Sequence, residues 1–210
     1  MVPELVNALS RAPLFAVLRG LPPSEAIPAC GALIEAGVSV LEVTLDSPAP
    51  YESLHLIAEH YGETALVAAG TTLTVAEAEH ALAAGARMIV APNFSPAVVS
   101  ATRAAGAISC PGVMTPTEAF AALEAGADCL KLFPGDAISP KVVTGMRAVL
   151  PSGTGVVVTG GVDADNLCAF LDAGANGVGI GSALYRPGKS PEAVYAAAEK
   201  FVALARRDIP

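Results

Sequence analysis

The chain is poor in charge, in aromatic side chains and in lysine. Its 210 residues include no tryptophan, only 5% of them are aromatic and only 15% are charged. The 12 basic residues are outnumbered by 20 acidic ones, which gives a net charge of −8. Arg206-Arg207 is the one basic cluster. Nucleic-acid binding requires a basic surface, so this composition excludes that function.

Long hydrophobic runs are also missing, although 53% of the residues are hydrophobic and the mean hydropathy is +0.55. The longest uncharged stretches, such as Ala148–Val162, contain glycine and proline. They fall short of the ~20 apolar residues that a membrane-spanning helix needs. Glu4 and Asn7 interrupt the N-terminal segment, where a signal peptide would need an unbroken apolar stretch. We therefore expect a cytoplasmic protein without a membrane partner, whose apolar residues cover an internal sheet.

Cysteine and histidine are too few and too scattered to predict a metal site. No two cysteines form a CxxC pair, and no histidine has a second ligand at a useful spacing. We expect free, buried cysteines in a reducing cytosol, and neither a metal nor another cofactor. The residues concerned are Cys30, Cys110, Cys129, Cys168, His55, His60 and His80.

What the chain does contain is a repeated unit of roughly 20 to 25 residues, the length of one strand plus one helix. An alanine-rich helical stretch ends at a glycine and a short apolar run follows, as in Glu124-Ala125-Gly126-Ala127. Glycine adopts the left-handed conformation that ends a helix, so it marks each turn from helix to strand. The expected markers are Gly37, Gly62, Gly85, Gly106, Gly126 and Gly174.

Helix starts are indicated by a hydroxyl residue directly before proline. The hydroxyl caps the free N–H groups of the first turn, and proline suits the first helical position. Thr115 is followed by Glu118, the spacing of a capping box. The five starts are Ser47-Pro48, Ser95-Pro96, Thr115-Pro116, Ser139-Pro140 and Ser190-Pro191.

These signals predict a (β/α)₈ TIM barrel of the α/β class, formed by residues 1–210 as a single domain. A short helix over Val2–Ser10 precedes the first strand, seven helices lie between strands, and one follows the last. A doubly wound open sheet is the alternative, but the even repeat favours closure. The expected strands are Leu14–Leu18, Val38–Thr44, Leu66–Ala69, Met88–Val90, Ile108–Cys110, Cys129–Leu132, Val156–Thr159 and Gly177–Ile180.

Lys131, one of only four lysines, lies in the apolar run between Leu130 and Leu132. On a strand, its ammonium group would point into a core or into the barrel interior. Burying a charge is costly, so burial favours the neutral, nucleophilic amine that a Schiff-base enzyme needs. The structural alternative is a lysine that reaches solvent at a strand end or pairs with a carboxylate.

Glu42 also lies in an apolar strand, where alternation places it on the same face as Val40 and Thr44. It is either a structural carboxylate paired inside the barrel or a proton shuttle whose protonated form is favoured by burial. Arg19 ends the first strand, where it could cap a helix or hold a substrate carboxylate through two contacts. Both side chains are expected near Lys131.

Residue pairs that contain glycine follow the last two strands, at the end of a barrel where active sites lie. Gly160-Gly161 follows the seventh strand, and Gly181-Ser182 follows the eighth. Glycines let backbone N–H groups approach an anion closely, and Ser182 could begin a short helix. Although turns need glycine anyway, both pairs at these two ends predict a phosphate site.

Taken together, eight ordered segments resemble the KDPG and KDPGal aldolase family, the small class I aldolases that cleave 2-keto-3-deoxy-6-phospho sugar acids. The segments run through nearly the whole chain. They are Leu18-Arg19-Gly20, Leu41-Glu42-Val43-Thr44-Leu45, Ala69-Gly70-Thr71, Ala91-Pro92-Asn93, Cys110-Pro111-Gly112, Leu130-Lys131-Leu132-Phe133-Pro134, Thr159-Gly160-Gly161-Val162 and Gly179-Ile180-Gly181-Ser182.

The resemblance implies a Schiff base on Lys131 and proton transfer by Glu42 through a water. It implies that Arg19 and Thr71 contact the pyruvate carboxylate and that Phe133 packs beside the imine. The phosphate group would be held by Gly160, Gly161, Gly181 and Ser182, and Pro92 and Thr159 would also contact the substrate. It also implies a homotrimer that works without a metal, with pyruvate and glyceraldehyde 3-phosphate as products.

The branch of the family is indicated by a few positions. The gluconate branch carries an arginine where this chain has Asp46, whereas Arg19 and Pro92-Asn93 resemble the galactonate branch. The resemblance therefore implies 2-dehydro-3-deoxy-6-phosphogalactonate as substrate. Thr159 instead resembles the gluconate branch, where the galactonate branch tends to carry valine, so a gluconate or dual specificity stays open.

Two other functions fit the same residues. A phosphate-binding barrel could perform isomerase, epimerase or synthase chemistry with Lys131 as an electrostatic group and no imine. A non-catalytic barrel could bind phosphosugars without releasing pyruvate. Two ionisable side chains hidden in strands argue for catalysis over mere binding.

Overall fold

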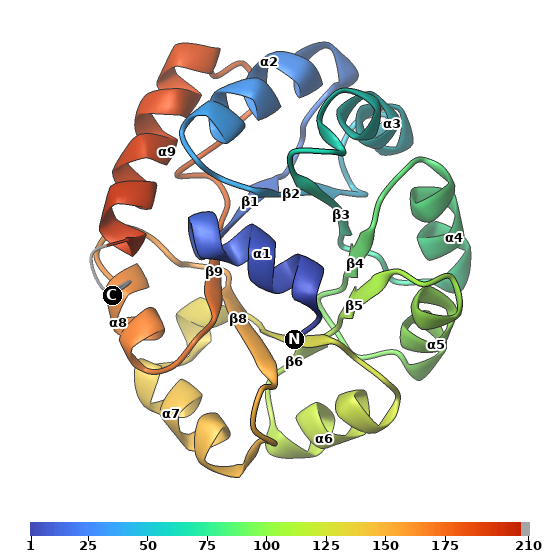
Figure 1. The fold of residues 1–210 in the computed structure, drawn as a ribbon, viewed down its shortest axis with the longest axis vertical. Coiled ribbons are helices and arrows are strands. Elements are labelled where there is room, and N and C mark those ends of the chain that lie inside the picture. The colour runs from blue at the N-terminus through green and yellow to red at the C-terminus, as the bar shows by residue number, and fades with distance from the viewer. Residues whose placement is uncertain (207–210) are drawn as a thin grey trace.

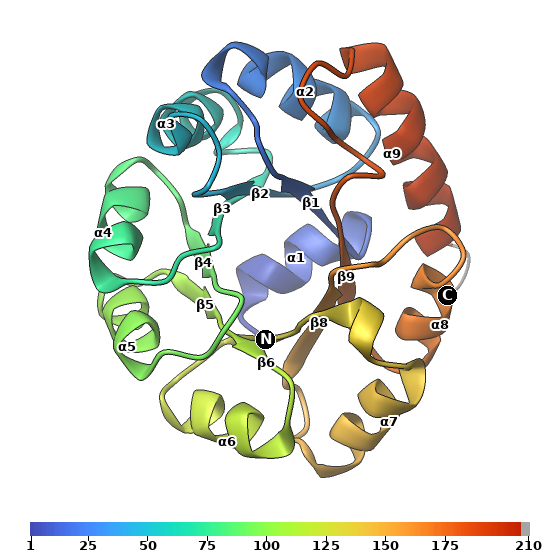
Figure 2. The ribbon, with the colours of Figure 1, turned by 180° about the vertical axis from the view of Figure 1, so that it is seen from behind.

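In the computed structural model, which describes residues 1–206, parallel strands form a nearly closed barrel surrounded by helices (Figures 1 and 2). The strand order is β5-β4-β3-β2-β1-β9-β8-β7-β6, and every recorded pairing is parallel. The strands are β1 (Leu14–Leu18), β2 (Val40–Thr44), β3 (Leu66–Gly70), β4 (Met88–Val90), β5 (Ile108–Cys110), β6 (Gly112–Val113), β7 (Cys129–Leu132), β8 (Gly155–Thr159) and β9 (Gly177–Ile180).

The helices lie outside the barrel, except for α1, which crosses its N-terminal end (Figure 1). No helix within residues 1–206 is long and apolar enough to span a membrane. The helices are α1 (Pro3–Arg11), α2 (Pro23–Glu35), α3 (Pro50–Tyr61), α4 (Val75–Ala83), α5 (Pro96–Ala104), α6 (Pro116–Glu124), the 3₁₀ turn η1 (Gly135–Ala137), α7 (Pro140–Val149), α8 (Leu167–Asp172) and α9 (Pro191–Ala205).

The predicted barrel is confirmed, with one strand divided in two. The fifth predicted strand matches β5, but pairing continues after Pro111 in β6, which lies outside the predicted strands. Proline lacks the N–H group that a strand donates, so it interrupts the strand. The Lys131 N–H donates to the Pro111 carbonyl at 2.9 Å, which helps to join the two edges of the sheet.

Two layers of apolar side chains stabilise the barrel. Alternate residues of β2 face opposite sides: Leu41 and Val43 pack under the helices, and Val40 points into the barrel. Leu5 and Leu9 of α1 join the inner layer, so this helix closes the N-terminal end with its apolar side. The C-terminal end of the barrel is left for the site.

Most of the predicted turns are confirmed, and their exceptions have local causes. Five of the six glycine markers have positive φ angles, but Gly62 is right-handed at φ −59°. A Cβ on Gly62 would collide with the Ala58 carbonyl, so a glycine is needed here for space. Ser190 and the Thr115–Glu118 capping box are confirmed. Ser47 caps nothing, because α3 begins at Pro50.

Some boundaries differ from the predicted ones by one or two residues. β2 begins at Val40 rather than Val38, and α1 runs from Pro3 to Arg11. All four cysteines are free, but Cys168 is half-buried rather than buried. Residues 207–210 of the predicted domain lie outside the described residues.

Candidate functional site

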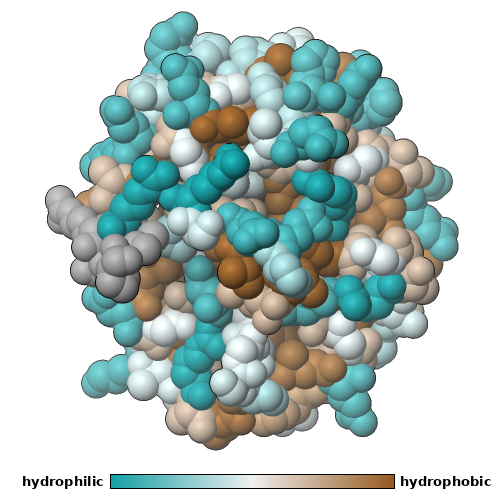
Figure 3. Space-filling view, in the orientation of Figure 1, coloured by the Kyte–Doolittle hydropathy of each residue, from teal (hydrophilic) through white to brown (hydrophobic). Residues whose placement is uncertain are grey.

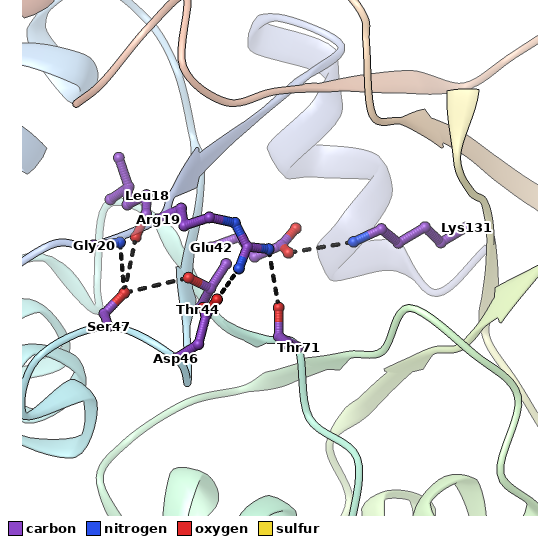
Figure 4. A network of polar contacts seen from close by, with 9 residues as sticks. All are labelled: Leu18, Arg19, Gly20, Glu42, Thr44, Asp46, Ser47, Thr71 and Lys131. Atoms are coloured by element: carbon purple, nitrogen blue, oxygen red, sulfur yellow. Dashed lines mark hydrogen bonds and ion pairs between the residues drawn. The ribbon is translucent and has the colours of Figure 1, made fainter. Parts of the chain in front are cut away.

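Lys131 and Glu42 meet inside the barrel, where the predicted pairing is confirmed. Lys131 on β7 points across the interior to Glu42 on β2, with 3.4 Å between Nζ and Oε1 (Figure 4). Lys131 is 5% exposed and Glu42 is 1% exposed. A buried ion pair of this kind adds little to stability, because the hydration that both charges lose offsets their attraction.

One carboxylate oxygen of Glu42 has no hydrogen-bond partner in the described part of the chain. This oxygen, Oε2, is buried. Gly70, at the end of β3, lies so close that a side chain there would collide with the Glu42 carboxylate. This oxygen can therefore still accept a hydrogen bond.

Arg19, Asp46 and Thr71 form a polar group next to this pair (Figure 4). Arg19 forms an ion pair with Asp46, and its Nη2 donates to the Thr71 hydroxyl at 3.3 Å. Thr71 is left-handed at φ +58°, a strain of roughly 1–3 kcal/mol for a residue with a side chain. The predicted neighbourhood of Arg19 and Thr71 is confirmed. Asp46, whose type departs from the gluconate pattern, proves to be the partner of Arg19.

Ser47 explains how the loop that carries Arg19 is held. Its hydroxyl accepts the Gly20 N–H at 2.9 Å and lies 3.2 Å from the Thr44 hydroxyl. The loop after β1 is thereby tied to the loop after β2 (Figure 4). The Ser47-Pro48 pair predicts a helix cap because the same Ser-Pro pattern precedes other helices of the chain. The contact of Ser47 with Gly20 could not be predicted, since it depends on the packing of two loops.

A cavity of about 430 Å³ opens at the C-terminal ends of β1, β7, β8 and β9. Within the described part of the chain, it brings together eight of the predicted residues and adds five that sequence reasoning missed. The eight are Arg19, Lys131, Phe133, Thr159, Gly160, Gly161, Gly181 and Ser182; the five are Val17, Val162, Asp163, Gly179 and Ala183.

Phe133 and the glycine turns give this cavity its shape. The Lys131 Nζ lies 5.3 Å from the centre of the Phe133 ring, over its face. Gly160 and Gly161 are both left-handed, at φ +96° and +66°. The Gly160 position lies against the Phe133 ring, where a Cβ would approach it to 3.2 Å, so only glycine leaves the ring in place.

Pro92, like Glu42 and Thr71, lies outside the set of residues that lines the cavity. It follows β4, and its carbonyl stands so close to Gly112 of β6 that a side chain at Gly112 would overlap it. Pro92 therefore lies where the two edges of the sheet meet, and its contact with substrate stays a prediction.

Cys110, on β5, carries a buried thiol. A hydrogen bond with Cys129, and to a smaller extent burial, raises the pKa of the Cys110 thiol well above its ordinary value, so the thiol stays protonated.

Within residues 1–206, no three His, Cys, Asp or Glu side chains gather as a metal site requires.

A second cavity, of about 410 Å³, lies at the opposite end of the barrel, beside α1. Hydrophilic side chains gather over the middle of this face (Figure 3). Its Arg87 is already engaged, by Glu4 at 2.9 Å and by the carbonyls of Gly62 and Ala65. This cavity has no counterpart of the buried Lys131–Glu42 pair.

Comparison with known proteins gives concordant matches. The family model "KDPG and KHG aldolase" matches residues 5–196. The chain is 42% identical to 2-dehydro-3-deoxy-6-phosphogalactonate aldolase of Escherichia coli (strain K12), over 92% of this chain and 94% of that protein. A structure of native KDPGal aldolase matches with a TM-score of 0.91 and 42% identity, covering 93% and 95% of the two chains.

A more distant match concerns the other branch and shows a trapped intermediate. It is the KDPG aldolase of Legionella pneumophila, with pyruvate captured at low pH as a covalent carbinolamine. Its TM-score is 0.83 at 25% identity, over 96% of this chain and 98% of that one. Identity is therefore higher to the galactonate enzyme than to this gluconate enzyme.

Proposed function

The chain belongs to the KDPG and KHG aldolase family, and we propose that it cleaves 2-dehydro-3-deoxy-6-phosphogalactonate through a Schiff base on Lys131. The products are pyruvate and glyceraldehyde 3-phosphate. The observation that carries the proposal is the buried pair of Lys131 and Glu42, 3.4 Å apart, with Lys131 lining the cavity. Pyruvate trapped as a carbinolamine in the Legionella relative supports covalent chemistry.

The reaction needs one nucleophile and one group that moves protons. The Lys131 ammonium passes its proton to Glu42 or to a water, and the resulting amine adds to the C2 ketone. The proton returns to the C2 oxygen, which leaves as water and gives a protonated imine. Glu42 takes the C4 hydroxyl proton, directly or through a water, and the electrons of the C3–C4 bond move into the imine. Glyceraldehyde 3-phosphate leaves, the resulting enamine gains a proton at C3, and water then releases pyruvate and restores the amine.

The polar groups around this pair orient the two ends of the substrate. Arg19 lies beside Thr71, so both can hold the carboxylate next to C2. Asp46 keeps the Arg19 guanidinium in place before the substrate arrives. The substrate carboxylate then competes with Asp46 for the N–H donors of Arg19. The glycine turns after β8 and β9 hold the phosphate with backbone N–H groups, at the far side of the same cavity.

Thr159 favours a second candidate, cleavage of the gluconate epimer as well. Its side chain lies in the cavity wall against Gly179, where a Cβ on that glycine would meet the threonine methyl at 2.8 Å. A hydroxyl in this wall offers a hydrogen bond that valine lacks. Measuring kcat/KM for the two C4 epimers side by side decides between a single and a dual specificity.

The test of the mechanism is reductive trapping. Borohydride added with pyruvate is expected to label Lys131 in the wild-type protein, as seen by peptide mass spectrometry, and Lys131→Met is expected to lose both label and turnover. Glu42→Gln should still be labelled while its kcat falls by roughly 10²–10⁴-fold. Lys200→Met is the matched control because that lysine lies on α9.

Two results would contradict the proposal. An unlabelled Lys131 with full turnover would favour isomerase, epimerase or synthase chemistry without an imine. Binding of the phosphosugar without pyruvate release, followed with coupled lactate dehydrogenase, would favour a non-catalytic barrel. We also propose that the protein acts as a cytoplasmic homotrimer, as the resemblance to the family implies.

A further inference from the structure

The segment after β9 forms a short turn with one end on the cavity. The Gly181 carbonyl accepts the N–H groups of Leu184 at 2.9 Å and Tyr185 at 3.1 Å, so residues 181–185 form a single helical turn. Gly181, Ser182 and Ala183 line the cavity. Within residues 1–206, the N–H groups of Ser182 and Ala183 donate to no protein acceptor.

Cationic side chains occupy the opposite end of the same turn. The Lys189 amine donates to the Leu184 carbonyl at 2.7 Å and to the Ala183 carbonyl at 3.2 Å. The Arg186 Nε donates to the Ser182 carbonyl at 3.2 Å. Positive charge at the carbonyl end stabilises the dipole of the turn, whose N–H end then faces the cavity.

Glu25, far away in sequence, fixes the rest of this segment. From the first turn of α2, its carboxylate accepts the Tyr185 hydroxyl at 2.7 Å and the Gly188 N–H at 3.1 Å. Burial, and then the hydrogen bond to Glu25, raises the pKa of the Tyr185 phenol, so the hydroxyl remains a donor. Tyr185 itself is only 2% exposed.

The same contacts bring the segment against the loop that carries Arg19. Gly20 is left-handed at φ +78°, and a Cβ there would lie 3.0 Å from Cγ of Pro187. The loop after β1 and the loop after β9 therefore touch. Glu25 lies on α2, which follows the loop after β1, and its carboxylate binds Tyr185 in the loop after β9. The distance between the carboxylate end and the phosphate end of the cavity depends on this junction.

We propose that Glu25 is a positioning residue that sets the phosphate-binding turn relative to Arg19, with Lys189 holding the other end of the turn. This inference rests on the proposed function. Glu25 and Lys189 do not line the cavity, so both act through the backbone of residues 181–188. Their loss is expected to weaken recognition of the phosphate while leaving the imine chemistry at Lys131 untouched.

The test compares a phosphorylated with an unphosphorylated substrate. In Glu25→Gln, kcat/KM for 2-dehydro-3-deoxy-6-phosphogalactonate is expected to fall roughly tenfold, mainly through KM, because the N–H groups are misplaced. The value for 2-dehydro-3-deoxygalactonate, and the rate of deuterium exchange into pyruvate, should stay unchanged. Glu35→Gln, at the other end of α2, is the matched control. Equal losses on both substrates would overturn the inference.

A second variant and a binding measurement keep the result decisive. Lys189→Met leaves Glu25 in place and should give the same pattern, which settles the matter if Glu25→Gln does not fold. Affinity for inorganic phosphate, measured by calorimetry, should be roughly tenfold lower in both variants than in wild type or Glu35→Gln. Equal affinities would overturn the inference even if the wild-type protein proved inactive, whereas an inactive wild type would contradict the proposed function alone.

Discussion

At the scale of single residues, the site depends on small residues that leave space for the larger side chains beside them. Gly70 illustrates this, because a Cβ there would meet Cγ of Glu42 at 2.7 Å. The space for the carboxylate of Glu42 is created by the absence of a side chain on the neighbouring strand. A glycine in a strand usually weakens it, so its presence here marks a close approach.

Gly70→Ala is therefore expected to displace Glu42 and reduce activity. We expect the free energy of unfolding to fall by about 1–3 kcal/mol, the usual cost of overpacking, and kcat to fall at least tenfold. Urea denaturation and the pyruvate-release assay measure the two effects.

Gly145→Ala is the matched control for this substitution. Gly145 lies inside α7, and nothing stands within 4 Å of the Cβ that the change adds. Alanine is the better helix former, so stability should rise by about 0.5–1 kcal/mol with kcat unchanged. A Gly70→Ala protein with wild-type kcat would show that the position of Glu42 does not matter.

At the scale of elements, local hydrogen bonds decide where helices begin. Two complete capping boxes are present in the described chain, Thr74–Glu77 at α4 and Thr115–Glu118 at α6. The second was expected from the Thr-Pro-Thr-Glu sequence, whereas the first was missed because no proline follows Thr74. Ser95 and Ser139 precede helices without a side-chain cap, which shows that the Ser-Pro pair locates a helix start better than it predicts the hydrogen bond.

Thr115→Ala should lower the free energy of unfolding by about 1 kcal/mol because it removes the cap of α6. It should leave kcat unchanged because Thr115 does not line the cavity. Hydrogen bonds from the Met114 N–H and then the Thr115 hydroxyl lower the pKa of Glu118. A lowered pKa means stability that is present above the ordinary carboxyl pKa and is lost as pH falls through the native value.

The difference between wild type and Thr115→Ala should therefore shrink on acidification, as followed by thermal denaturation at a series of pH values. Thr144→Ala is the control, since Thr144 donates only to the Pro140 carbonyl within its own helix. A difference that grows toward acid pH would contradict this assignment of the cap.

At the scale of the whole molecule, closure of the sheet leaves one end of the barrel for chemistry. The helix α1 covers the N-terminal end, and Leu5 and Leu9 fill the interior beneath it. Lys131 lines the cavity at the C-terminal end, and Glu42 is buried beside it. This is the end of a (β/α)₈ barrel at which active sites lie.

The proposed homotrimer is tested at the same scale. Light scattering after size-exclusion chromatography should give the mass of three chains of 21.0 kDa, about 63 kDa. Phe120 and Val149 are exposed apolar side chains, 45% and 54% accessible, of the kind that association would cover. A mass of 21.0 kDa over the working concentration range would rule the trimer out.

The secondary-structure elements, their order and the residues with unusual chemistry can be predicted from local patterns of residues. Capping hydroxyls, glycines after helices and apolar runs act within a few residues, so they can be recognised without the fold. Lys131 and Glu42 were recognisable for the same reason, because a charge within an apolar strand is a local anomaly. The pairing of β6 after Pro111 was missed because it depends on β7, and the right-handed Gly62 was missed because it depends on the Ala58 carbonyl one turn earlier.

Which of these residues come into contact depends on how the whole chain folds. Lys131 and Glu42 are 89 positions apart, and their contact exists because the sheet closes and places β2 across the interior from β7. The pairing of Arg19 with Asp46, and of Glu25 with Tyr185, depends on loops from different strands coming together at one rim. Such distances follow from strand register and barrel closure, which no local pattern of residues encodes.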